Sequence, residues 1–433
     1  MGRPAGWQAA SAGPGVPALN KSGPMAVLGL MSDVTATFAF DHQPRTRLVF
    51  GCGTLDRVGE LAQELGGRRV LLVTDPGIVR AGHARRATEC LTEAGLAVAT
   101  FADVRPNPTT LDVDRCVTAL RAHAGDLLIG LGGGSSLDTA KGANFIATNG
   151  GMMQDYWGVG KATRPMLPLI AIPTTAGTGS ECQSAALIAD ERTHRKMACL
   201  DPKAAARVAI LDPELTVSQP PRVTACTGID ALAHALETAV ARKRNAVSSI
   251  YSREAFRLLV TSLGRVLAAP GDVEARGRML LGAAFAGTAI ENSMLGAAHA
   301  AANPLTAHFG IVHGEAVGVM LPPVIRFNAA GDPEARHQYA DLAQSAGLPG
   351  ADRGDDAAVV SLVTAVELCL EVGRLPRALA GWGIDRAAVP ELAAAAAREW
   401  TAGFNPRPVN EADFAALYAA ALGSPANAIP ATR

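Results

Sequence analysis

Between Arg69 and Pro213 the sequence alternates short apolar runs with segments of helical periodicity, and this alternation constrains the fold more than any other feature. The run RVLLVTD starts at Arg69 and stays apolar almost to its end, which is typical of a strand buried on both faces of a parallel sheet. A helical pattern follows it, and further strand-like runs come at 96–104, 126–132, 167–173, 185–190, 196–200 and 207–215. The alternation predicts an α/β domain with a mainly parallel, doubly wound sheet, in which 185–190 and 196–200 form a hairpin-like pair.

The second half of the chain has a different character. Beyond Pro220, Ala, Leu, Arg and Glu recur at helical spacing without a convincing strand, which predicts an all-α domain. A chain of 433 residues also exceeds what one core usually spans. We therefore predict an α/β domain over 34–213 and a helical domain over 214–433. Residues 1–33 carry Gly, Pro, Ala and Ser in no periodic order and are predicted to be a disordered extension.

Composition excludes several classes of partner. The formal net charge is −1 and no long Lys or Arg run occurs, so we expect no nucleic-acid partner. No apolar run reaches the roughly 18 residues of a membrane span, so we expect no membrane partner. The seven cysteines are scattered singly, without the spacing of a disulfide framework, and this favours a cytoplasmic location.

The segment GLGGGSSLDTAK, at 130–141, follows a predicted strand and opens a predicted helix. Glycines let backbone N–H groups approach a diphosphate closely, so we interpret this turn as part of a dinucleotide site, with a plain tight turn as the alternative. Asp75, at the end of an earlier strand, can accept hydrogen bonds from ribose hydroxyls and repel a 2′-phosphate, which favours NAD(H) over NADP(H). A helix N-cap explains Asp75 equally well. The hydroxyl-rich loop at 173–181 can hold a ribose or a phosphate.

Four residues of the helical half have spacings that suit a divalent metal. Asp230 and His234 are one helical turn apart and project from one helix face, so a carboxylate and an imidazole can converge on one ion. His299 and His313 lie fourteen positions apart and would come from another helix and the loop after it. The spacing alone is weak, because a lone His beside apolar neighbours is more often a satisfied core residue than a ligand.

Together these segments resemble the iron-dependent, or group III, alcohol dehydrogenases. The resemblance runs from about Phe38 to Leu422 and rests on segments in a fixed order: FGCGTL, VTD, PNPT, GGGSSLDTAKG, IPTTAGTGSE, DPELT, GIDALAHALE and HAAANPLTAHFGIVHGEAVGVMLP. It implies a dinucleotide-binding α/β domain, an all-α C-terminal domain and an active site in the cleft between them, the architecture shared with dehydroquinate synthase. It also implies an enzyme that transfers hydride between a small alcohol and NAD(H), which makes a small alcohol or aldehyde the expected partner.

The resemblance also assigns individual residues. It implies that Fe²⁺, or Zn²⁺ in some members, is bound by Asp230, His234, His299 and His313. The positions that it implies for the cofactor are Asp75, Asn107, Gly133, Gly134, Ser135, Asp138, Thr174, Thr175, Thr178 and Lys196. A metal at this site would polarise the alcohol oxygen so that hydride can leave its carbon.

One position departs from the family pattern. Many members have a histidine where this chain has Asn303, and an amide cannot titrate near neutral pH. We therefore expect Asn303 to orient the nicotinamide or the substrate without acting as an acid or base. Three rival functions stay open: a maleylacetate-reductase-like enzyme, a dehydroquinate-synthase-like enzyme, and a non-catalytic NAD-binding module with a structural metal. Assembly into a homodimer or a larger homo-oligomer is also open.

Overall fold

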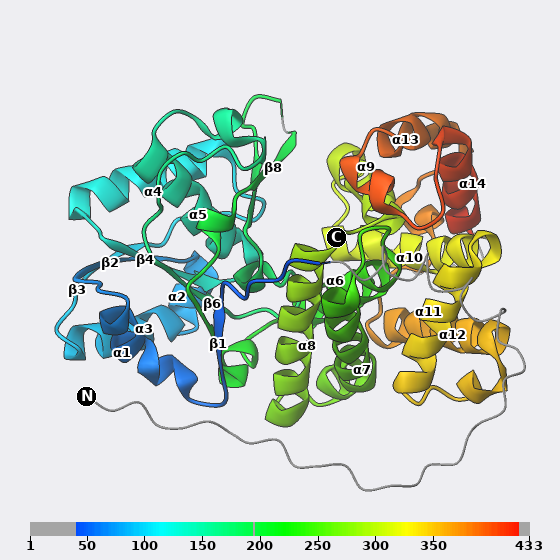
Figure 1. The fold of residues 1–433 in the computed structure, drawn as a ribbon, viewed down its shortest axis with the longest axis horizontal. Helices are drawn as coiled ribbons and strands as arrows, with labels where there is room; N and C mark the ends of the chain where they lie inside the picture. Colours follow the sequence, from blue (N-terminus) through cyan, green and yellow to red (C-terminus); the bar gives the residue numbers. More distant parts are fainter. Residues whose placement is uncertain (1–39, 194, 424–433) are drawn as a thin grey trace, which may run out of the picture. The chain divides into compact units, whose positions relative to one another are not determined.

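The structure is a computed structural model, and it describes residues 40–193 and 195–423 of the chain. The extension predicted over 1–33 lies outside these residues. The described residues form one compact unit that holds both a sheet and a large helical part (Figure 1). The boundary predicted at 213/214 stays a prediction.

A six-stranded parallel sheet organises the first half of the described chain, with strand order β1-β9-β6-β4-β2-β3. Its strands are β1 (Arg47–Phe50), β2 (Arg69–Val73), β3 (Ala97–Phe101), β4 (Leu127–Gly132), β6 (Leu169–Pro173) and β9 (Val208–Leu211). Every residue of β4, β6 and β9 is buried, which explains their continuous apolar runs. The sequence analysis missed β1, an edge strand that is mostly exposed and pairs only with β9.

Helices cover both faces of this sheet (Figure 1). They are α1 (Val58–Glu64), α2 (Pro76–Arg80), α3 (His83–Glu93), α4 (Thr110–His123) and α5 (Gly134–Asn149). Because successive strand residues point to opposite faces, Leu71 and Leu128 pack with α4 and α5, whereas Leu72 and Ile129 pack with α1 and α3. All carboxyl ends of the parallel strands lie at one sheet edge, and there the loops after β2, β4 and β6 meet.

A second, three-stranded sheet has the order β5-β8-β7. Its strands are β5 (Gly158–Val159), β7 (Ala185–Ala189) and β8 (Lys196–Leu200). Strands β7 and β8 are antiparallel, which confirms the predicted hairpin-like pair, although they do not join the large sheet.

Beyond β9, the described residues form helices and no strand. The α-helices are α6 (Pro221–Val240), α7 (Ala246–Ala268), α8 (Val273–Asn292), α9 (Ala297–Phe309), α10 (His313–Gly331), α11 (Pro333–Ser345), α12 (Asp355–Val372), α13 (Val389–Ala396) and α14 (Glu411–Leu422). Helix α6 is buried on almost every side from Thr224 to Val240 and forms the centre of a core made largely of Ala and Leu. The α/β and all-α halves predicted from the sequence are confirmed.

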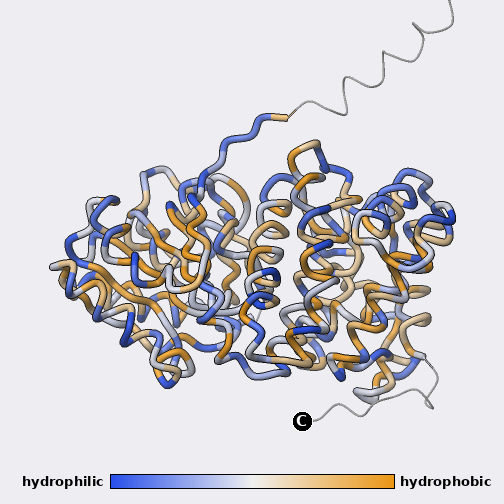
Figure 2. The backbone as a smooth tube through the Cα atoms, turned by 90° about the horizontal axis from the view of Figure 1, so that it is seen from below, coloured by the Kyte–Doolittle hydropathy of each residue, from blue (hydrophilic) through white to orange (hydrophobic). Residues whose placement is uncertain are grey.

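Hydrophilic residues gather in the outer loops and on the outward faces of helices, as Figure 2 shows. Within the described residues, none of the helices is both long enough and apolar enough to cross a membrane. All seven cysteines are free thiols.

The two halves touch through a glycine pair. A Cβ atom added to Gly287 of α8 would lie 2.3 Å from the carbonyl oxygen of Gly179, in the loop after β6. Gly179 itself has a φ of 62°, in the left-handed region that favours glycine. Close by, Glu291 accepts hydrogen bonds from the backbone N–H and the hydroxyl of Ser184 and is paired with Arg45. The loop after β6 is therefore held directly on α8.

We expect Gly287→Ala to lower the free energy of unfolding by about 1–3 kcal/mol, because the added methyl must push α8 off the Gly179 backbone. Gly264→Ala in the neighbouring helix α7 is the matched control, since an added Cβ there meets nothing within 4 Å. That change should raise stability by about 0.5–1 kcal/mol through helix propensity. Urea denaturation measures both, and two variants that shift in the same direction would contradict the close contact.

Candidate metal centre and cofactor site

Helix α6 supplies the first part of a buried polar cluster. Asp230 and His234 are one turn apart on this helix, and their side chains are 8% and 6% exposed. The Asp230 Oδ1 atom lies 3.5 Å from His234 Nε2. The i, i+4 spacing therefore brings the two groups together, as predicted.

Two further histidines converge on the same carboxylate oxygen. His299, in the first turn of α9, places Nε2 at 3.4 Å from Asp230 Oδ1, and His313, the first residue of α10, places Nε2 at 3.8 Å. The His234 and His299 rings are stacked with centroids 4.9 Å apart. Side chains from three helices thus meet around one oxygen atom.

This donor set fits a divalent cation. Ligands at about 2.0–2.2 Å from a tetrahedral ion stand about 3.3–3.6 Å apart, close to the separations seen here. The ligand atoms of Asp230, His299 and His313 lie within 4.8 Å of one another. Asp230 Oδ1 and His299 Nε2 are buried, and neither forms a hydrogen bond with another described residue. Two unsatisfied buried atoms facing one another are what a bound ion would satisfy.

The electrostatics of the cluster suit a cation as well. Burial would raise the pKa of Asp230, but the three histidines outweigh it and hold that pKa well below its ordinary value. Burial lowers the pKa values of His234 and His313, with Lys196 adding to the effect at His313. Asp230, His234 and His313 therefore favour the protonation states that bind a metal, an ionised carboxylate and neutral imidazoles.

Glu237 belongs to this site, and the sequence analysis missed it. It lies one turn beyond His234 on α6, is buried, and is hydrogen-bonded through Oε2 to His299 Nδ1. Its Oε1 accepts from the backbone N–H groups of Ala298 and His299. Although burial lowers the pKa of His299, Glu237 and Asp230 raise it to about 9. Glu237 therefore fixes the ring so that Nε2 faces the cluster. The signal was its spacing, seven residues after Asp230 on the same helix face.

The start of α10 is docked against α6. A Cβ atom at Gly314 would lie 2.1 Å from the carbonyl oxygen of Cys226, so only glycine permits this approach. The next residue, buried Glu315, is paired with Arg222 at 2.6 Å. Cys226 lies one turn before Asp230 on α6. The contact with Gly314 therefore places the preceding residue, His313, beside Asp230.

The predicted phosphate loop lies at the carboxyl edge of the sheet. Gly133 is the N-cap of α5, and a Cβ atom there would lie 3.3 Å from Thr175. At Gly134 a Cβ atom would lie 2.8 Å from Thr178. The structure thus brings the glycine turn after β4 against the hydroxyl-rich loop after β6, where Thr174 is also found. Ser135 follows in the first turn of α5.

Asp75 is a helix N-cap, as the alternative interpretation predicted, and one of its carboxylate oxygens is still available to a ribose. Its Oδ1 accepts from the backbone N–H groups of Gly77 and Ile78, so it is the N-cap of α2. Its Oδ2 faces the next loop, because a Cβ atom at Gly132 would lie 3.2 Å from it. One oxygen therefore caps a helix while the other borders the glycine turn.

The other predicted cofactor residues differ in their surroundings. Asp138 is buried and accepts from the Ser180 hydroxyl at 2.7 Å and the Leu187 N–H at 3.3 Å, so its carboxylate already has protein partners. Burial raises the pKa of Asp138 and lowers that of His313; the charge of Lys196, exposed on β8, opposes the first shift and adds to the second, so Lys196 lies in electrostatic reach of both. Asn107 is in an exposed loop with a φ of 52°.

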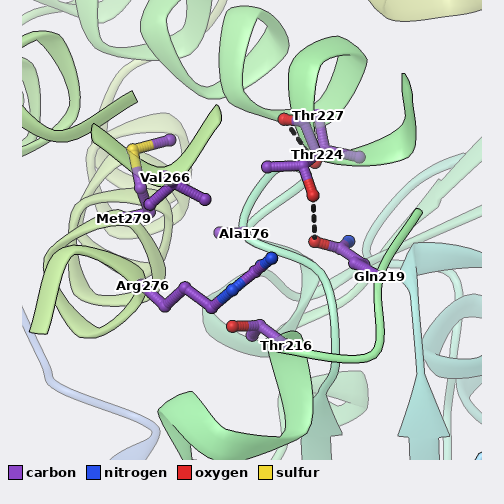
Figure 3. A pocket seen from close by; sticks show the side chains of 8 residues that line it. All are labelled: Ala176, Thr216, Gln219, Thr224, Thr227, Val266, Arg276 and Met279. Carbon is purple, nitrogen blue, oxygen red and sulfur yellow. Dashed lines mark hydrogen bonds between the residues drawn. The ribbon is translucent and has the colours of Figure 1, made fainter. Parts of the chain in front are cut away.

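A small pocket with room for about one water molecule, partly open to solvent, lies between the loop after β6 and the start of α6. It is lined by Ala176, Thr216, Gln219, Thr224, Thr227, Val266, Arg276 and Met279, as Figure 3 shows. Buried Arg276 points into it and donates through Nε to the Pro270 carbonyl. None of the four clustered metal-ligand candidates lines it, and a space for about one water molecule is far too small for a dinucleotide or an alcohol. We do not assign the active site to this cavity.

Comparison with known proteins agrees with the fold. The family model described as iron-containing alcohol dehydrogenase matches residues 44–213, and the model of the C-terminal part of the Fe-containing alcohol dehydrogenase family matches 224–422. The chain belongs to the iron-containing alcohol dehydrogenases. The resemblance noted in the sequence is confirmed, and the chain is an alcohol oxidoreductase.

Relatives of this alcohol dehydrogenase cover most of its length. It is 34% identical over 383 residues to the 1,3-propanediol dehydrogenase of Klebsiella pneumoniae, and the match covers 88% of this chain and 98% of that protein. It is 34% identical to the NAD-dependent methanol dehydrogenase of Bacillus methanolicus over 86% of this chain and 97% of that protein. A crystal structure of a 1,3-propanediol oxidoreductase superposes with a TM-score of 0.84 at 32% identity, covering 88% of this chain and 100% of that one.

Asn303 lies one turn after His299 on α9 of this alcohol dehydrogenase. Its Nδ2 donates to Glu399 Oε2 at 2.8 Å. The amide therefore has a partner in the segment after α13, which the sequence analysis did not foresee because 96 residues separate the two.

Glu181, in the short helix after β6 (Ser180–Cys182), is an unusual buried carboxyl group. Its Oε1 has no hydrogen-bond partner within the described residues. Burial raises the pKa of Glu181 to about 7, although its own backbone N–H and Lys141 oppose the shift. The neutral acid is thus favoured in the folded protein below neutral pH.

This raised pKa predicts a pH dependence of stability. From pH 4.5 to about 7 the folded protein keeps a proton that the unfolded chain has lost, so the free energy of unfolding should fall as pH rises and level off above about 7. The loss should reach up to about 3 kcal/mol. Glu181→Gln cannot ionise, so its stability relative to the parent should increase from pH 5 to pH 8. Urea denaturation across this range tests it, and parallel pH profiles for the two proteins would contradict it.

Proposed function

We propose that Asp230, His234, His299 and His313 hold one Fe²⁺ ion and that the enzyme transfers hydride between a small alcohol and NAD(H). The observation that carries the proposal is the convergence of three imidazole Nε2 atoms within 3.8 Å of Asp230 Oδ1, with unsatisfied buried atoms at the centre. Zn²⁺ accepts the same ligands and is the second candidate metal. The names of relatives, among them a methanol and a 1,3-propanediol dehydrogenase, support small alcohols as substrates.

The bound ion would act as a Lewis acid on the oxygen of the alcohol or carbonyl compound. The residues of the chain supply the rest. Glu237 holds the His299 ring through Nδ1, and the ionised Asp230 supplies the negative charge. His313 is 29% exposed, whereas the other three side chains of the set are 5–8% exposed, so the cluster is most open on the His313 side. We infer that the substrate approaches from this side.

For the cofactor, we propose a site along the carboxyl edge of the sheet. The diphosphate would lie at the N-terminus of α5, where Gly133 and Gly134 are only partly buried. Asp75 Oδ2 borders the same turn and would accept hydrogen bonds from the adenosine ribose. Lys196 has electrostatic reach to His313 and would thus lie where the nicotinamide end of the cofactor meets the metal centre.

The rival functions have less support. A purely structural metal is usually enclosed by four protein ligands, whereas His313 leaves one side of this cluster accessible. A metal-free reductase of the maleylacetate type has no need of four converging ligands. A dehydroquinate-synthase-like enzyme handles a polyanionic substrate, and the segment 299–322 contains neither Lys nor Arg. Family membership also favours the alcohol dehydrogenase.

Loss of one ligand should empty the site. We expect His234→Ala to lose most of its bound metal and nearly all activity, because one of only four donors is gone. Metal content by mass spectrometry and NADH oxidation with short aldehydes measure both effects. His337→Ala is the matched control, since this exposed histidine pairs only with Asp355 and should leave both readouts unchanged. Full activity in metal-depleted His234→Ala would refute the metal mechanism.

Asp75 should set the choice of cofactor. In the parent we expect a marked preference for NAD(H), because the Asp75 carboxylate would repel a 2′-phosphate by about 1–3 kcal/mol. Asp75→Gly should reduce the ratio of kcat/KM for NAD(H) over NADP(H) by at least tenfold. Asp75→Gly also removes the cap of α2, so the melting temperature is measured alongside. An unchanged ratio with a lowered melting temperature would mean that Asp75 acts only as a cap.

A further inference from the structure

The contact between Asn303 and Glu399 determines which atom of the amide remains free. A carboxylate can only accept hydrogen bonds, so the group that Asn303 turns toward Glu399 must be its NH₂. The carbonyl oxygen, Oδ1, then points away from Glu399. Oδ1 accepts no hydrogen bond from the other described residues. Asn303 is therefore left as a hydrogen-bond acceptor.

Asn303 lies one helical turn after His299, a proposed metal ligand, on α9. His299 turns Nε2 into the cluster, and Asn303 follows it by four residues on the same face of α9. Asn303 is only partly buried, so its side chain is accessible to a small ligand.

The part of the chain that follows Glu399 is hydrogen-bonded to α9. It precedes the short helix Trp400–Phe404, whose following residue, Asn405, accepts a hydrogen bond from the Ala297 N–H in the first turn of α9. Further along the chain, the Tyr418 hydroxyl of α14 donates to the Ala301 carbonyl of α9. Two segments that follow Glu399 in the chain are thus tied to the helix that carries Asn303.

We propose that Glu399 is a positioning residue that fixes Asn303 as a hydrogen-bond acceptor in the substrate site, so that the enzyme favours alcohols carrying a second hydroxyl group. A second hydroxyl can donate to Asn303 Oδ1, whereas a simple alcohol leaves that oxygen without a partner. This inference rests on the proposed alcohol dehydrogenase function and adds the substrate class.

The test compares 1,3-propanediol with 1-propanol as substrates, using NAD. The parent should prefer the diol in kcat/KM. Glu399→Gln can donate as well as accept, which lets the Asn303 amide rotate, so the diol preference should fall by about fivefold or more. Glu391→Gln is the matched control, because Glu391 is 78% exposed on α13 and pairs only with exposed His308; it should keep the parent ratio. No diol preference in the parent, or an unchanged ratio in Glu399→Gln, would overturn the proposal.

A stability measurement tests the amide orientation without turnover. Asn303→Asp sets two carboxylates against each other, so its melting temperature should fall clearly below that of the parent at pH 7.5. Combining it with Glu399→Gln restores a donor–acceptor pair, and the melting temperature should recover. Additive effects of the two changes would overturn the Asn303–Glu399 coupling. A parent that oxidises neither alcohol contradicts the proposed function itself, and the stability coupling then still decides the orientation of the amide.

Discussion

The charge of Asp230 inside the protein is the constraint on which the site depends. An ionised carboxylate in a buried helix is costly unless other groups compensate it, and here three imidazoles from α6, α9 and α10 surround one of its oxygens. The arrangement requires helix ends to be packed closely: Glu237 binds the first turn of α9, and Gly314 lets the start of α10 touch the backbone of α6. The contacts that pack α9 and α10 against α6 therefore also bring the four side chains of the site together.

The link between the sheet and the helical core follows the same principle of close backbone approach. Gly179, in the loop after β6, touches Gly287 of α8, and Ser184 is bonded to Glu291 one turn further along that helix. Inside the α/β half, Lys141 is completely buried and donates to Ser180 and to the Ala185 carbonyl, which ties the same loop to α5. A loop that borders the proposed cofactor site is thus fixed from both sides.

Much of the fold could be predicted because its signals are local. The buried strands β4, β6 and β9 are continuous apolar runs, and the helical half has helical periodicity throughout. Strand β1 gave no such signal, since only one of its four residues is buried and its place depends on pairing with β9, about 160 residues later. For the small sheet, the pairing of two neighbouring strands could be predicted from the sequence, but their separation from the large sheet could not.

The sequence by itself indicated the Asp230–His234 pair and the glycine turn, because a four-residue helical spacing and a strand–glycine–helix pattern are encoded in neighbouring residues. His299 and His313 were assigned as further donors through the resemblance to a known family. Only the tertiary structure shows that Glu237 is hydrogen-bonded to His299 and that Asn303 donates to Glu399. It also shows that one carboxylate oxygen of Asp75 caps a helix while the other does not. These three contacts depend on which side-chain atoms the fold brings together, and the direction of a hydrogen bond depends on both partners. Residue identity supplies a donor or an acceptor, and packing chooses its partner.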